Sequence, residues 1–99
     1  MTITKTLNNG ILTLAPEGRI DIVTAPELEE VFNSSTEKFY ELIVDFEKVE
    51  YISSAGLRVL LRAHKKMVKD GGYMKVIHVR DDVMEVFVNM GFKDILNFD

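Results

Sequence analysis

The alternation of short apolar runs with amphipathic sequence constrains the fold of this chain more than any other feature. Residues 41–46, ELIVDF, form a continuous apolar run of the kind found in parallel strands that are buried on both faces. Residues 73–79, YMKVIHV, form a second such run, and helix-forming sequence separates the two. Strands that alternate with helices indicate an α/β domain with parallel strands and right-handed crossovers.

The predicted helix between these strands begins at Ser53 or Ser54, and Gly71 and Gly72 end it. Apolar residues recur along it every three to four positions, which is the spacing of one helix face. The predicted inner face consists of Leu57, Leu60, Leu61, His64 and Val68.

The chain is predicted to open with a β-hairpin. Residues 2–7 alternate in polarity, the sequence NNG at 8–10 is typical of a tight turn, and residues 11–15 form the return strand. Residues 18–23, GRIDIV, are expected to be extended. The predicted order is therefore a hairpin, followed by alternating helices and strands.

Two further helices are predicted from their capping signals. Thr24 and Glu27 can form a capping box, with Pro26 in the first turn. Asp81 or Asp82 is expected to cap the other helix. The first has the apolar face Ala25, Leu28, Val31 and Phe32; the second has Val83, Val86, Phe87 and Met90, with Gly91 at its end and a short extended segment at 92–98.

The length, composition and charge of the chain exclude several classes of protein. The 99 residues suffice for one domain, and the absence of cysteine excludes disulfides and thiolate metal sites. The net charge of −4 argues against general nucleic-acid binding, and no apolar run is long enough to span a membrane, so a cytoplasmic protein is expected. Residues 17–50 hold ten of the sixteen acids, whereas 58–69 hold five bases and no acid, which indicates either two solvated helix faces or a surface for a protein partner.

The sequence offers no catalytic set. His64 lies ten residues along the predicted helix from Ser54, an axial rise of about 15 Å, so it cannot activate that hydroxyl. His78 has no evident carboxylate partner, and the histidines and acids are too dispersed for a metal site. Asp45 is read as a strand-end carboxylate that caps neighbouring backbone rather than as a phosphate acceptor. Plain helix capping by Ser53 and Ser54 is the simplest reading of the two serines.

Two segments together resemble the STAS domain, and in particular bacterial anti-sigma-factor antagonists. They are GRIDIVTAPEL, residues 18–28, and VEYISSAGLRVLL, residues 49–61. The resemblance implies a single STAS domain over residues 1–99, with a mixed, mostly parallel sheet and helices packed mainly on one face. It also implies that Ser54 is a phosphorylation site. Ser53, which stands where the family most often has aspartate, is the second candidate.

The resemblance further implies a partner-switching module that is not an enzyme. The unphosphorylated protein would bind an anti-sigma factor, which is a serine kinase, and so release a sigma factor. Phosphorylation would end the complex, and a metal-dependent serine phosphatase would restore it. No cofactor, nucleic acid or membrane is expected for this chain itself. The predicted partner-binding residues are Asp21, Ser53, Ser54, Ala55, Gly56 and Arg58. The alternative is a STAS scaffold or ligand-sensing subunit without a phosphoswitch.

Overall fold

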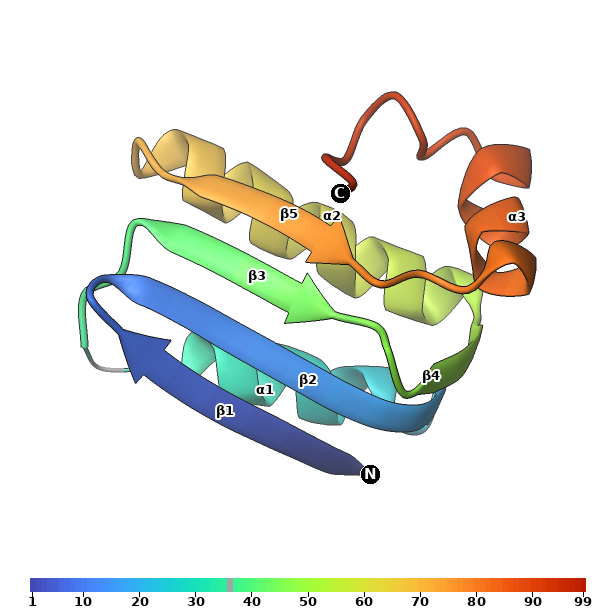
Figure 1. The fold of residues 1–99 in the computed structure, drawn as a ribbon, viewed down its shortest axis with the longest axis horizontal. Coiled ribbons are helices and arrows are strands. Elements are labelled where there is room, and N and C mark those ends of the chain that lie inside the picture. The colour runs from blue at the N-terminus through green and yellow to red at the C-terminus, as the bar shows by residue number, and fades with distance from the viewer. Residues whose placement is uncertain (36) are drawn as a thin grey trace.

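The computed structural model describes residues 1–35 and 37–99. Within these ranges the chain forms five strands and three helices (Figure 1). In chain order they are β1 (Thr2–Asn8), β2 (Ile11–Ile20), α1 (Ala25–Asn33), β3 (Glu41–Asp45), β4 (Val49–Ile52), α2 (Ser54–Lys69), β5 (Tyr73–Ile77) and α3 (Asp81–Asn89).

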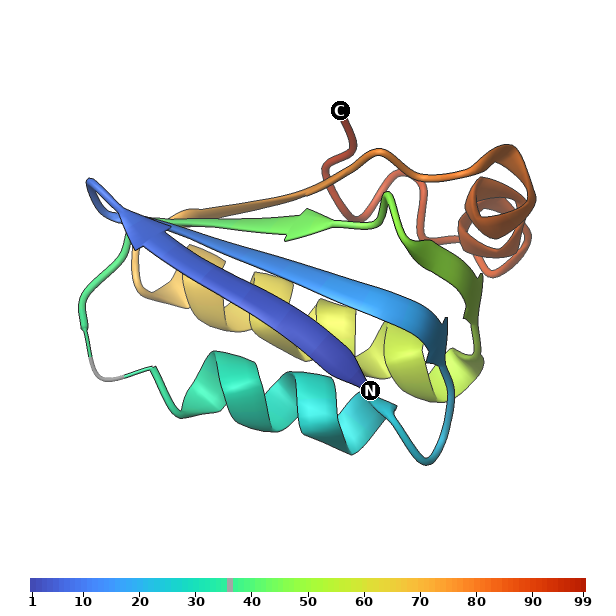
Figure 2. The same cartoon turned by 60° about the horizontal axis from the view of Figure 1, so that its bottom comes forward.

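The strands form one mixed sheet, as predicted. The main path is β1-β2-β3-β5, with β4 paired to the far end of β2. The β1–β2 hairpin is antiparallel, and every other pairing is parallel. Helices α1 and α2 lie together under one face of the sheet, whereas α3 lies at its end, beside β4 (Figure 2).

Strand β2 is longer than predicted because it changes partner along its length. It pairs with β3 as far as Leu14 and with β4 from Gly18 onward. Pro16, which has no N–H to donate, lies between these two ladders. The two predicted extended segments are thus one strand that ends at Ile20, and the expected extension to residue 23 is wrong. Strand β4 was not predicted from the sequence.

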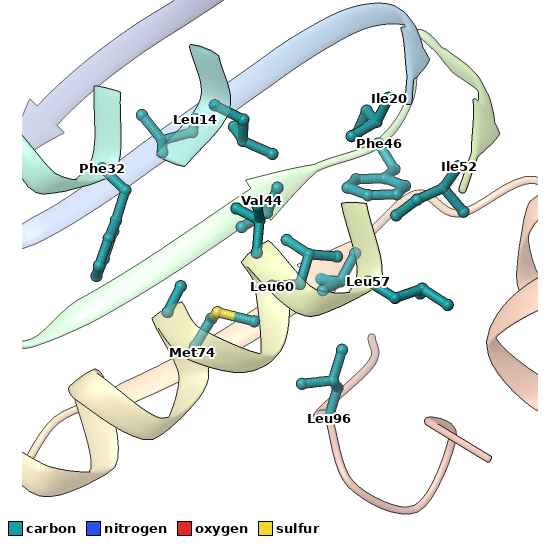
Figure 3. Packing of buried hydrophobic residues seen from close by; sticks show 14 of the residues in the cluster. Leu14, Ile20, Phe32, Val44, Phe46, Ile52, Leu57, Leu60, Met74 and Leu96 are labelled. Atoms are coloured by element: carbon teal, nitrogen blue, oxygen red, sulfur yellow. The ribbon is translucent and has the colours of Figure 1, made fainter. Parts of the chain in front are cut away.

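The core lies between the sheet and the two helices beneath it (Figure 3). In β3, Leu42 and Val44 are buried and point toward the helices, whereas Ile43 is half-buried on the opposite face. Successive side chains of a strand point to opposite faces, and no helix of the described residues covers the second face. The prediction that this strand is buried on both faces is therefore wrong.

The inner face of α2 is shifted from the predicted one. Leu57 and Leu60 are buried as expected, but Leu61 and His64 are half-buried and Val68 is 57% exposed. The buried row continues instead through residues 63 and 67, which are spaced at i+3 and i+7 from Leu60 and therefore lie on the same side of the helix. At the C-terminus of α2, Gly71 has φ of +80° and ends the helix as predicted.

The last part of the chain differs most from prediction. Arg80, not Asp81 or Asp82, is the N-cap of α3, and the two aspartates lie in its first turn. Phe87 is fully buried, with ring-centroid distances of 5.9 Å to Phe46 and 4.9 Å to Phe98. Met90, expected on the inner face, is 51% exposed. Residues 92–98 form turns, with an isolated parallel bridge between Val76 and Phe98 in place of the expected extended segment.

Candidate functional site

The two serines of the SSAG segment lie in different environments at the start of α2. Ser53 is the N-cap residue and has an extended backbone, with φ of −98° and ψ of 175°. Its amide donates to the carbonyl of Ile20 at 2.8 Å, which ties the start of the helix to the end of β2. Its Oγ is buried and has no hydrogen-bond partner among the residues that the structure describes. Ser54, the first residue of the helix, is exposed.

The Ser54 hydroxyl faces a cation one helical turn away. Nη2 of Arg58 lies 3.5 Å from Ser54 Oγ, and both side chains are exposed. The amides of the first turn of a helix have no intrahelical acceptor and carry partial positive charge. The surroundings of Ser54 therefore favour an anionic group.

Gly56 has a packing role beneath this surface. It is buried, and a Cβ at this position would lie 2.7 Å from Cγ2 of Ile20 and 2.8 Å from Cγ1 of Ile52. A glycine therefore lets the first turn of α2 approach the ends of β2 and β4 closely. Because Gly56 is buried and has no side chain, it offers no contact to a partner protein. Ala55 beside it is partly exposed.

Asp21 organises the loop between β2 and α1. Its Oδ1 accepts hydrogen bonds from the amides of Val23, at 3.0 Å, and Thr24, at 3.1 Å. The Thr24 hydroxyl donates to the carbonyl of Arg19 at 2.7 Å and accepts from the amide of Asp21 at 2.9 Å. Thr24 is the N-cap by position, but its side chain serves this loop, so the predicted capping box with Glu27 does not form. The hydrogen bond from the Thr24 amide is the main cause that lowers the pKa of Asp21 below its ordinary value.

The same loop exposes two apolar side chains that sequence reasoning missed. Ile22 is 78% exposed and Val23 is 75% exposed. Hydrophobic sequence alone does not reveal this, because it fits a continuing strand equally well; the turn made by Asp21 turns both residues outward. Contiguous exposed apolar surface is one mark of a protein–protein contact, and Ile22 and Val23 contribute two adjacent side chains to such a surface.

The sheet brings the loop and the serines to one end of the molecule. Ile20 at the end of β2 pairs in register with Ile52 at the end of β4, so the residues that follow them lie side by side (Figure 1). Together these residues form what we call the Ser54 surface, which consists of Asp21, Ile22, Val23, Ser54, Ala55 and Arg58.

A second polar cluster lies at the ends of β3 and β5. Nδ1 of His78 lies 2.9 Å from Oδ1 of Asp45, so the expectation that this histidine has no carboxylate partner is wrong. This hydrogen bond raises the pKa of His78 above its ordinary value. Asp45 Oδ1 also accepts from the amide of Glu47 at 3.0 Å, which confirms its predicted role at the strand end. Asp45, Glu47 and His78 bring donor atoms within 4.8 Å of one another, so the acids and histidines are not all dispersed.

Comparison with known proteins identifies the family. The sequence pattern of the STAS domain matches residues 2–99. The chain belongs to the STAS domain family. This membership agrees with the mixed sheet and its helices, and it confirms the resemblance carried by the two sequence segments.

Several proteins similar to this STAS domain are named anti-sigma factor antagonists. The anti-sigma-B factor antagonist of Bacillus subtilis (strain 168) is 31% identical over 80 residues, which cover 81% of this chain and 73% of the relative. That of Staphylococcus aureus (strain NCTC 8325 / PS 47) is 28% identical over 81 residues, covering 81% and 75%. A crystal structure of an anti-sigma factor antagonist from Mycobacterium paratuberculosis superposes with a TM-score of 0.85 at 24% identity, covering 98% of this chain and 83% of that one.

None of the helices in the described part of this STAS domain is long and apolar enough to cross a membrane.

Proposed function

We propose that this STAS domain is an anti-sigma-factor antagonist whose binding is switched by phosphorylation of Ser54. The unmodified protein binds an anti-sigma factor through the Ser54 surface and so leaves a sigma factor free to act. The observation that carries the proposal is that Ser54 is exposed at the same end of the molecule as the exposed apolar residues Ile22 and Val23. The chain that places them there is 31% identical over 80 residues to an anti-sigma-B factor antagonist.

The difference in accessibility supports Ser54, rather than Ser53, as the phosphate acceptor. A kinase must reach the hydroxyl oxygen, and the hydroxyl of Ser54 lies at the surface of the helix start. The Oγ of Ser53 is buried below it, where a phosphate would collide with the core and lose its hydration. Ser53 and Gly56 thus hold the helix start in place, while the partner contacts fall on the Ser54 surface.

The surroundings of Ser54 allow a phosphate without loss of the fold. A phosphoserine carries about −1.5 to −2 charges at pH 7. The free amides of the first turn of α2 and the guanidinium of Arg58 can both interact with that charge. The domain therefore stays folded, and what changes is the charge of the Ser54 surface.

The same charge explains how the complex would end. Ile22 and Val23 are exposed and would be buried against a partner. A phosphate next to such an apolar contact must be desolvated or paired when the partner binds, and either requirement weakens the complex. Asp21 positions both apolar residues, and its own carboxylate adds a charged contact at the edge of this surface.

The chemistry of the switch would belong to the partners. An anti-sigma factor that is a serine kinase supplies ATP and magnesium for phosphorylation, and a metal-dependent serine phosphatase removes the phosphate. In this proposal the chain acts as a binding module and a phosphorylation substrate.

Affinity capture from the native host, with each of three forms of the protein as bait, tests the proposal. Wild type and Ser54→Ala should both recover an ATP-binding serine kinase, and Ser54→Asp should recover at least tenfold less. With the recovered kinase and ATP, intact mass should show one added phosphate on wild type and on Ser53→Ala, and none on Ser54→Ala. Circular dichroism of each bait checks that its fold is retained.

Two outcomes would contradict the proposal in different ways. If Ser54→Ala is phosphorylated and Ser53→Ala is not, Ser53 is the phosphate acceptor, and the proposed site is wrong by one residue. If neither serine is modified and no kinase is recovered, the chain acts as a scaffold or ligand-sensing subunit.

A further inference from the structure

The ends of β3 and β5 gather side chains that the proposed function does not use. Asp45 ends β3, Glu47 lies two residues later, and His78 directly follows β5. One ligand atom from each of these three residues lies within 4.8 Å of the others. We propose that Asp45, Glu47 and His78 form a binding site for one divalent transition metal ion of the zinc type.

The donor set selects the class of metal. An imidazole nitrogen with two carboxylate oxygens suits zinc and its first-row neighbours, whereas magnesium and calcium prefer oxygen ligands alone. Three protein ligands leave the remaining coordination positions to water, as in open zinc sites.

The observed spacing is close to that of two ligands on one ion. Ligand atoms about 2.0–2.2 Å from zinc lie about 3.0–3.5 Å from each other, depending on the coordination angle. Nδ1 of His78 and Oδ1 of Asp45 are 2.9 Å apart, so a displacement of a few tenths of an ångström admits the metal between them. The metal then takes the place of the proton that these two atoms share. The side chain of Glu47 is exposed and free to rotate toward the ion.

The backbone holds two of the ligands in place before any ion binds. Asp45 pairs in register with Ile77, and the amide of Phe46 donates to the Ile77 carbonyl at 2.9 Å. His78, the next residue, has φ of +56°, which turns its ring back toward β3. Phe46 is fully buried and packs against Phe87, so the turn that carries Glu47 starts from a fixed point. A preformed site loses less conformational entropy when it binds its ion.

Titration of the purified protein with zinc chloride, in a non-chelating buffer and without an affinity tag, tests the site. Calorimetry should give one zinc ion per chain, and the melting temperature should rise with zinc and return to its starting value with EDTA. His78→Ala should weaken zinc binding at least tenfold. Glu47→Gln and Asp45→Asn should each weaken it severalfold. Asparagine keeps the Oδ1 that accepts the Glu47 amide, so the turn should be retained.

His64→Ala is the matched control, because this second histidine lies on α2, outside the cluster, and should leave zinc binding unchanged. Magnesium chloride at the same concentrations should give no melting shift that depends on His78. The site is excluded if wild type binds less than one equivalent of zinc, or if zinc binds His78→Ala and wild type equally well. It is also excluded if His64→Ala removes binding as fully as His78→Ala does.

Discussion

Arg58 lies one helical turn from Ser54, with its Nη2 atom 3.5 Å from the serine hydroxyl oxygen. The pair is exposed, and in the unmodified protein it is a long hydrogen bond that adds little stability. If Ser54 is phosphorylated, as we propose, the hydroxyl oxygen gains a phosphate that carries about −1.5 to −2 charges at pH 7. Arg58 would then form an ion pair with that phosphate within one helix.

This geometry predicts the protonation of the phosphate. In the phosphorylated protein, Arg58 should lower the second pKa of phosphoserine 54, since it favours the dianion. A shift of about 0.2–0.7 unit is expected, because exposed ion pairs contribute about 0.2–1 kcal/mol. A pH titration followed by phosphorus NMR measures it in wild type and in Arg58→Ala. Equal values in the two proteins would show that Arg58 does not contact the phosphate.

Removal of either serine hydroxyl should cost little stability, and for a different reason at each position. Ser53→Ala removes a buried oxygen that has no partner in the described structure, so the free energy of unfolding should be unchanged or rise by up to about 1 kcal/mol. Ser54→Ala should change it by less than about 0.5 kcal/mol, because Ser54 is exposed and is not the cap residue. Urea unfolding measures both. A loss of about 1 kcal/mol in Ser53→Ala would mean that its hydroxyl caps the helix after all.

The sequence predicted the layers of this fold well where local signals are strong. The hairpin follows from an alternating strand and the NNG turn, and the end of α2 follows from Gly71, whose positive φ few other residues tolerate. Strand β4 was missed because four residues that include Glu50 and Tyr51 carry no clear alternation. It is a strand because it pairs with the end of β2, which is a tertiary contact.

The partner of His78 was missed because it comes from a distant part of the chain. His78 and Asp45 are 33 residues apart, and they meet only because β3 and β5 are neighbours in the sheet. The local sequence of neither strand predicts which strands will be neighbours in the sheet. By contrast, Asp21, Ser54, Ala55 and Arg58 lie in two segments that carry their own motifs, so these four residues of the Ser54 surface could be named from the sequence. Ile22 and Val23 could not, because their exposure depends on the turn that Asp21 makes.

The corrected face of α2 predicts a contrast between two of its apolar residues. Leu60 is 1% exposed in the core, and Leu60→Ala should lower the free energy of unfolding by about 2–5 kcal/mol. Val68, which the sequence placed on the same face, is 57% exposed, and Val68→Ala should cost less than about 0.5 kcal/mol. Chemical denaturation of the two variants compares them directly. Similar losses in both would restore the face predicted from the sequence.

Gly56 should be intolerant of even one methyl group. Alanine favours helix by up to about 1 kcal/mol over glycine, but its Cβ would lie under 3 Å from side-chain atoms of Ile20 and Ile52. Overpacking of this kind costs about 1–3 kcal/mol, so Gly56→Ala should be destabilising overall. In the double variant with Ile52→Ala, the total loss should be smaller than the sum of the two single losses. Strict additivity would show that the helix start moves freely to accept the methyl group.

The contribution of Asp21 to stability should decrease at acid pH. Its pKa is lowered in the folded state, chiefly by the hydrogen bond from the Thr24 amide. The stabilisation is therefore complete above the unfolded-state pKa of about 3.9 and is lost as pH falls through the lower folded-state pKa.

Asp21→Asn keeps an oxygen that can accept from Val23 and Thr24 but carries no charge. Wild type should be more stable than Asp21→Asn near pH 6, and this difference should shrink below pH 4. Asp21→Ala removes the acceptor as well and should be the least stable of the three. If the difference between wild type and Asp21→Asn is the same at pH 6 and pH 3, the carboxylate charge contributes nothing to the loop.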